Sequence, residues 1–212
     1  MFGFIKDVWW KIQDVLAVQI GKVSWKTSRV MSAEDFDVIR GKLKDNYFII
    51  VTRHNGHLSS HVISLLHFFL TGKYGYYGHV MMNVEDEVGD DGDYRFIEST
   101  AEGTHFSGFT RAFDPGVSSV ALLKPKSMSI TSWTAVLDKA KMQDGKPYDT
   151  LFDLSNDRAL SCVELIRVAL QSEPGYSTNF AEFEKMIAKA KNLDPMFFYE
   201  CADFEVVWEM RH

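Results

Sequence analysis

The sequence has few cysteines, few cationic residues and no long uninterrupted apolar run. Its two cysteines, Cys162 and Cys201, are too few for a disulfide framework and fit a reducing compartment. The 23 lysine and arginine residues are outnumbered by 29 aspartate and glutamate residues, which gives a formal net charge of −6. Because nonspecific nucleic-acid binding needs a basic face, this charge balance predicts that nucleic acid is not a partner.

The N-terminal residues contain neither a membrane-spanning segment nor a secretory signal. Charged residues interrupt the apolar positions of residues 2–20, and no basic region precedes an apolar run with a small-residue cleavage site. We therefore expect no transmembrane segment and a cytoplasmic location, with release by lysis or within a virion as alternatives. The apolar spacing predicts an amphipathic helix that docks on the domain, on a partner or on a second subunit. Its apolar positions are Phe4, Ile5, Val8, Trp9, Ile12, Val15, Leu16 and Val18.

A hydrophobic content of 46% over 212 residues is enough for one well-buried core. The order of the predicted elements is typical of an α+β fold with a mostly antiparallel sheet and helices packed on it. Predicted helices cover residues 33–43, 59–72, 131–142, 159–170 and 179–191, and predicted strands cover residues 47–53, 76–85, 94–100, 118–126 and 203–210. We divide the chain into an N-terminal helical extension, residues 1–44, and a domain formed by residues 45–212.

Two polar clusters resemble metal sites but lack residues that such sites need. Four histidines lie close together in the sequence, and two of them are four residues apart, but no glutamate lies between these two and no cysteine is nearby. The four are His54, His57, His61 and His67. In the acidic stretch of residues 86–93, Gly89 occupies a calcium-loop position that needs an oxygen ligand. We expect a solvated hairpin turn there and no metal at either place.

Cys162 lies in the first turn of the predicted helix "ALSCVELIRVAL". Free cysteine is usually a buried, inert small hydrophobe, which is one interpretation. The other is a nucleophile, because the positive end of a helix dipole favours the thiolate that attacks carbonyl carbon. The position alone does not decide between them, since a nucleophile also needs a base and an orienting group.

A predicted hairpin supplies candidates for both groups. His79 begins the apolar strand "HVMMNVE", and Glu98 lies on the following strand, "RFIEST". Because the turn falls between them, the two side chains can meet at the end of the hairpin away from that turn. A carboxylate beside an imidazole fixes its tautomer and supports the imidazolium. If the helix of Cys162 packs across this hairpin, the three residues complete a set of nucleophile, base and orienting group.

These segments resemble a known family over residues 45–170. The motifs "GHVMMN", "FIES" and "SCVELI", with "PYDTLF" before the last, are similar to those of the circularly permuted NlpC-type papain-like cysteine hydrolases, the YiiX-like and lecithin-retinol-acyltransferase-like group. Histidine before cysteine is the reverse of the ordinary papain order and marks the permuted group. The sequence departs from the pattern at Met81, at Val163 and in the acidic insertion between the two hairpin strands.

The resemblance implies a permuted papain-like fold and assigns roles to five residues. Cys162 would be the nucleophile, His79 the general base and Glu98 the residue that orients His79. Tyr148 would line the substrate pocket, and Asp149 would shape the same loop. The implied activity is hydrolysis of an amide or ester bond through a thioacyl intermediate, for example by a cell-wall peptide amidase or endopeptidase, with no cofactor.

Two alternatives remain open at this point. An acyltransferase would use the same nucleophile with an acceptor other than water. A non-catalytic binding or structural module could retain the scaffold without the chemistry, because fold does not fix function. The hydrolase interpretation predicts that the sulfur of Cys162 faces the ring of His79. It also predicts that the space above them is reachable by solvent and walled in part by Tyr148.

Overall fold

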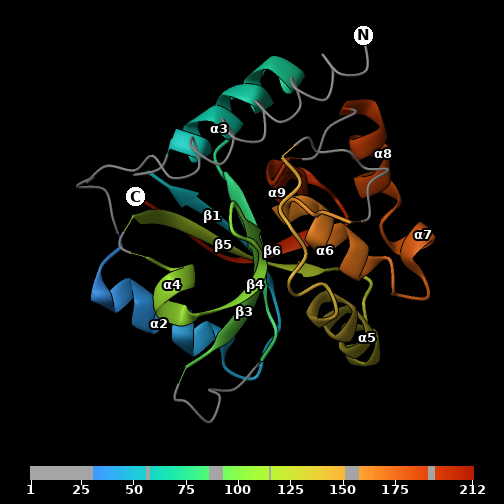
Figure 1. Ribbon diagram of the computed structural model, residues 1–212, viewed down its shortest axis with the longest axis horizontal. Coiled ribbons are helices and arrows are strands. Elements are labelled where there is room, and N and C mark those ends of the chain that lie inside the picture. The colour runs from blue at the N-terminus through green and yellow to red at the C-terminus, as the bar shows by residue number, and fades with distance from the viewer. Residues whose placement is uncertain (1–30, 56–57, 86–92, 115, 151–157, 191–193) are drawn as a thin grey trace, which may run out of the picture.

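The computed structural model describes residues 31–55, 58–85, 93–114, 116–150, 158–190 and 194–212. Within these residues the elements follow the α+β order expected from the sequence (Figure 1). The helices are α2 (Ala33–Leu43), α3 (Leu58–Thr71), α4 (Phe109–Ala112), α5 (Ile130–Lys141), α6 (Cys162–Leu170), α7 (Tyr176–Asn179), α8 (Ala181–Ala190) and α9 (Met196–Glu200). The strands are β1 (Ile49–His54), β2 (His79–Asn83), β3 (Arg95–Thr100), β4 (Gly103–Gly108), β5 (Val117–Pro125) and β6 (Phe204–Arg211).

The strands form one six-stranded sheet in the order β4-β3-β2-β1-β5-β6. Every neighbouring pair in it is antiparallel. Sequential strands therefore pair directly from β1 through β4, and β5 returns to the other side of β1. The predicted α+β class with a mostly antiparallel sheet is confirmed.

Alternate residues of the same strands build two separate cores. Val80 and Met82 of β2 face the layer of α5, α6, α8 and α9, whereas Met81 faces α2 and α4. This two-residue alternation is what a sheet covered on both faces requires. Figure 1 shows α2 and α4 on one side of the sheet, α5, α6 and α8 on the other, and α3 across one end.

Helix α2 begins as the sequence predicts. The side chain of Ser32 accepts a hydrogen bond from the backbone N–H of Asp35, and the Asp35 carboxylate accepts one from the backbone N–H of Ser32. This reciprocal cap satisfies two N–H groups that the first helical turn leaves unpaired. Ile39 and Leu43 are then buried against the sheet. The predicted helix at residues 2–20 lies outside the described residues, and the boundary at residue 44 stays a prediction.

Candidate active site at the start of helix α6

A capping box fixes the start of α6 and the place of Cys162. The Ser161 side chain accepts from the backbone N–H of Glu164, and the Glu164 carboxylate accepts from the backbone N–H of Ser161 at 2.7 Å. Cys162 is consequently the first helical residue, whose N–H group has no acceptor within the helix. A second tie holds the preceding residue, because Ser99 Oγ of β3 donates to the carbonyl oxygen of Leu160 at 2.5 Å.

The predicted hairpin brings His79 and Glu98 together. His79 Nε2 lies 2.8 Å from Glu98 Oε2, although 19 positions separate the two residues. Glu98 is in register with Met81, two residues along β2 from His79, so strand alternation places all three on the face of α2 and α4. His79 is the first residue of β2, and at this end of the strand its ring also lies near Cys162. Burial raises the pKa of the Glu98 carboxyl, but its polar neighbours, His79 first, outweigh burial, and the net pKa lies below its ordinary value.

Cys162 is a second neighbour of the His79 ring, close enough to act on its pKa. Burial lowers the pKa of His79, but the interactions with Cys162 and Glu98 raise it to about 10. These partners favour the imidazolium, the form that can donate a proton. Because Glu98 occupies Nε2, Nδ1 is the ring nitrogen left for the thiol.

Tyr148 and Asp149 lie on a loop that the β3–β4 turn holds in place. The backbone N–H of Thr104 donates to the carbonyl oxygen of Lys146 at 2.7 Å, and the N–H of Gly145 donates to the carbonyl oxygen of Thr104 at 2.9 Å. Gly103 has a φ of 99°, and a Cβ atom there would lie 2.6 Å from the carbonyl oxygen of Lys146. Glycine is therefore required at this close approach.

The same loop brings a phenol and a carboxyl group to α6. Burial is the main cause that raises the pKa of Tyr148 well above its ordinary value, and electrostatic interactions with Cys162, Glu164 and Asp149 add to it. Asp149 is buried and hydrogen-bonded to the Glu164 side chain. Burial is also the main cause that raises the pKa of Glu164 to about 7, and the charge of Asp149 adds to it. The five residues named from the sequence thus lie in one neighbourhood.

The solvent exposure of this neighbourhood differs from the expectation. Cys162 is only 3% exposed, because it packs within the core that α6 forms with the sheet. The His79 side chain is 24% exposed, so solvent reaches the imidazole more readily than the thiol. An open space directly above the sulfur was expected from the sequence, and the exposure of Cys162 does not agree with it.

His105 is a neighbour of the site that the sequence did not indicate. It lies directly opposite Glu98 in the β3–β4 register, and its Nε2 is 3.7 Å from Glu98 Oε1. Its Nδ1 lies 2.9 Å from the carbonyl oxygen of Gly103 and donates to it, since a carbonyl only accepts. Strand β4 was not predicted, so the pairing was missed. The available signal was Gly103, which ends a short turn after "FIEST" and begins a second hairpin.

The histidines considered as metal ligands have other partners. His54 Nε2 lies 2.5 Å from Asp114 Oδ1, His61 Nε2 lies 3.3 Å from the carbonyl oxygen of Asn55, and the buried His67 pairs with Asp194. Within the described part of the chain, no group of three or more histidine, cysteine or acidic side chains could hold a metal ion. His57 and the acidic turn lie outside the described residues.

Comparison with known proteins gives one structural similarity. No family model matches the sequence, and no curated protein is similar to it. The fold is similar to the crystal structure of the metalloprotein YiiX from Escherichia coli O157:H7, a DUF1105 protein, with a TM-score of 0.55 and 17% identity. The similarity covers 79% of this chain and 98% of the YiiX chain, so the two proteins share a fold. Among the described residues, no helix is both long and apolar enough to cross a membrane.

Proposed function

We propose that the protein is a cysteine-dependent hydrolase of amide or ester bonds, with Cys162, His79 and Glu98 acting together on a permuted papain-like scaffold. The observation that carries this proposal is that the His79 ring contacts the Glu98 carboxylate and lies close enough to Cys162 for the thiol to act on its pKa. Nucleophilic catalysis of this kind needs a thiol beside an imidazole and a carboxylate on the other side of that imidazole. The histidine also precedes the cysteine in the chain, as in the permuted group that the sequence resembles.

In the first half-reaction, the Cys162 thiolate attacks the substrate carbonyl carbon and a carbon–sulfur bond forms. The thiol proton is held by His79, whose imidazolium is stabilised by the Glu98 carboxylate. As the tetrahedral intermediate collapses, the carbon–nitrogen or carbon–oxygen bond breaks. The leaving amine or alcohol takes its proton from His79, which leaves a thioester on Cys162 and a neutral imidazole.

In the second half-reaction, His79 accepts a proton from water as the water oxygen attacks the thioester carbon. The carbon–sulfur bond then breaks, the carboxylic acid departs, and the Cys162 thiolate and the His79 imidazolium are restored. An acyltransferase would follow the same steps with an alcohol or amine in place of water.

The start of α6 also supplies a donor for the negative charge that develops on the carbonyl oxygen. The backbone N–H of Cys162 is at the first helical position and has no acceptor within the helix. Such a donor, fixed before the reaction begins, typically contributes about 10²–10³ in rate. The capping box of Ser161 and Glu164 keeps this N–H in place, because it sets where the helix begins.

The substrate class follows from the resemblance and from the loop beside α6. We assign the pocket wall to Tyr148 and the shape of the loop to Asp149, which is buried against Glu164. Peptide amides of the cell wall are the first candidates, and acyl esters are the second. The cytoplasmic location expected from the sequence stays a prediction.

The burial of Cys162 favours a second candidate, a non-catalytic module on the same scaffold. A thiol that is 3% exposed meets a substrate only if the side chains that cover it move. In a non-catalytic protein the thiol would simply fill the core beside α6.

A substrate screen separates the two candidates. Full-length protein is incubated with peptidoglycan peptides, amino-acid amides and acyl esters, and release of the amine or alcohol is followed. Turnover is expected from wild type and from Cys201→Ala, the matched control that removes the other buried thiol. Cys162→Ala should show none.

Trapping of the acyl-enzyme is the second readout. Brief incubation with an active acyl ester, followed by intact-protein mass spectrometry, should show one acyl group on Cys162. Equal turnover in wild type and Cys162→Ala would overturn the proposed chemistry. A complete lack of both turnover and acylation, with the fold intact, would favour the non-catalytic module.

A further inference from the structure

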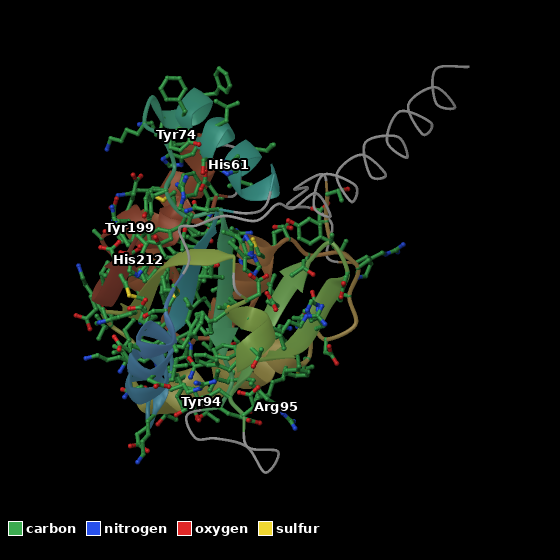
Figure 2. All side chains as sticks on the ribbon, turned by 90° about the vertical axis from the view of Figure 1, so that its left-hand side faces the viewer. His61, Tyr74, Tyr94, Arg95, Tyr199 and His212 are labelled. Atoms are coloured by element: carbon green, nitrogen blue, oxygen red, sulfur yellow. The ribbon has the colours of Figure 1, made fainter. Side chains whose placement is uncertain are left out.

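Helix α3 exposes an apolar surface. Phe69 is 73% exposed, and the helix as a whole, "LSSHVISLLHFFLT", has no aspartate, glutamate, lysine or arginine. Other exposed apolar side chains are Val62, Leu65 and Phe68 of α3 and Tyr74 just beyond it. Figure 2 shows α3 at the rim of the molecule, with aromatic rings projecting outward near Tyr74. Contiguous exposed apolar side chains of this kind mark a surface that binds something.

The helix is oriented with its polar stripe inward. Ser64 and His67 are buried, and His61, three positions before Ser64, is partly buried. Positions three apart lie on the same side of a helix, so these three polar residues lie on its inner side. An ordinary surface helix has the reverse arrangement, with its apolar stripe inward. The outer face of α3 therefore has the chemistry of a second interface.

Specific contacts prevent α3 from turning its apolar face inward. His67 Nδ1 is 2.9 Å from Asp194 Oδ2, and both side chains are almost fully buried. The backbone N–H of Gly75 donates to the carbonyl oxygen of Ser64, and a Cβ at Gly75 would lie 2.7 Å from the Cβ of His67. Rotating the helix would break the buried contact between His67 and Asp194 and the close packing of His67 against Gly75.

We infer that the outer face of α3 is the docking site of the chain's own N-terminal segment, residues 4–18. The sequence of this segment has its apolar residues at helical spacing and so needs an apolar surface to cover them. Its polar positions carry Lys6, Asp7, Lys11 and Asp14, which balance in charge. Docking would bury the apolar side chains of the segment against those of α3 and leave these four charged residues in water.

The length of the N-terminal segment and the point where it joins the domain both agree with docking on α3. A helix over residues 4–18 would be about 22 Å long, and the 14-residue α3 is about 21 Å long. The described chain starts at Met31, whose backbone N–H donates to the carbonyl oxygen of Val117. Val117 is in register with His54, the last residue of β1, which leads directly into α3. The segment therefore enters the domain beside α3, and residues 19–30 can span up to about 40 Å.

Amide hydrogen exchange on the full-length chain, read by mass spectrometry, tests the inference. An undocked helix of this length is only marginally stable in water, so protection of residues 4–18 would report docking. The double variant Leu65→Ser/Phe69→Ser should speed their exchange by about tenfold or more. Met142→Ser/Val206→Ser, which removes two exposed apolar side chains elsewhere, is the matched control and should leave the rate unchanged.

Each other outcome overturns the inference. Residues 4–18 that exchange at the unprotected rate in wild type are not docked. Protection that the double variant does not change places the segment elsewhere on the molecule. Protection that is lost on dilution assigns the α3 face to a second copy. Protection that arises only after addition of neutral phosphatidylcholine vesicles assigns the face to a lipid surface. The inference concerns a surface distinct from Cys162 and does not depend on the proposed chemistry.

Discussion

Glu98 and His105 face each other across β3 and β4, with Glu98 Oε1 3.7 Å from His105 Nε2. The other oxygen of the same carboxylate contacts His79, so Glu98 lies between two imidazoles. The His105 ring is oriented by the carbonyl oxygen of Gly103, which leaves Nε2 directed at Glu98. The charge of His105 is one of the causes that lower the pKa of Glu98.

The variant His105→Gln should move the acidic limb of kcat/KM to higher pH. Without the imidazole, the pKa of Glu98 rises, and the carboxylate that supports His79 is lost sooner as pH falls. We expect a displacement of less than about 1 pH unit, because several other groups also act on Glu98. A pH–rate profile of wild type and variant measures it. An unchanged acidic limb would show that His105 does not influence the site.

Substitutions of the three central residues should differ in severity. Cys162→Ala should abolish turnover, and His79→Ala should lower it by about 10²–10⁴, the usual contribution of general acid–base catalysis. Glu98→Gln should be milder than either, because the proposed role of Glu98 is to orient His79. Steady-state kinetics rank the variants, and a greater loss in Glu98→Gln than in His79→Ala would reverse the roles assigned to these two residues.

The same variants should remain folded. Cys162→Ala removes one buried sulfur from the first turn of α6 and should cost on the order of 1 kcal/mol of unfolding free energy. Urea denaturation measures this cost, and a much larger loss would mean that the kinetic effect reports unfolding.

Alkylation should distinguish the two thiols. Burial is the main cause that raises the pKa of Cys201 to about 12, so it should react very slowly with iodoacetamide at neutral pH. Cys162 has an imidazolium partner in His79 and should react faster, with the rate falling in His79→Ala. Peptide mapping after labelling between pH 6 and 9 gives both rates. Equal, slow labelling of the two thiols would contradict a nucleophilic role for Cys162.

The Glu164 carboxyl makes stability depend on pH in a defined direction. Its folded pKa, about 7, lies above the ordinary value of 4.5. Between these values the folded chain holds a proton that the unfolded chain has released, so stability falls as pH rises from about 4.5 to 7.

The variant Glu164→Gln should remove this loss. It keeps an oxygen that accepts the backbone N–H of Ser161 and has no proton to release. Relative to wild type, its unfolding free energy should rise across this pH range, by on the order of 1–3 kcal/mol at pH 8. Urea denaturation at several pH values measures it, and Glu34→Gln, at an exposed position on α2, is the control. Parallel stability curves for wild type and Glu164→Gln would contradict the raised pKa of Glu164.

The predictable part of the fold was the part with regular hydrophobic patterns. The predicted strands at residues 94–100 and 118–126 correspond to β3 and β5, and the predicted helix at 131–142 corresponds to α5. Strand β4, "GTHFSG", was missed because it has two glycines and little apolar alternation, and its position is determined by pairing with β3. Helix α9, "MFFYE", is a single short turn that tertiary packing holds in place.

The sequence predicted those parts of the candidate site that depend on a single hairpin or a single helix cap. The proximity of His79 and Glu98 follows from one hairpin, and the place of Cys162 follows from the Ser161 cap. The burial of the thiol could not be predicted, because it depends on how α6 packs on the sheet. The contact between Glu164 and Asp149 could not be predicted either, because it joins a helix to a loop.

The candidate site has two parts that are far apart along the chain. His79, Glu98 and His105 belong to three consecutive strands. Cys162 is anchored through Leu160, whose carbonyl oxygen is bound by Ser99, 61 positions before Leu160. Contacts between distant positions form late because closing a long loop costs entropy. In a chain still being synthesised, both imidazoles and Glu98 are present before the thiol is. The thiol, the imidazole and the carboxylate come together only when α6 packs on the sheet. The nearly complete domain is therefore the smallest unit that can form the candidate site.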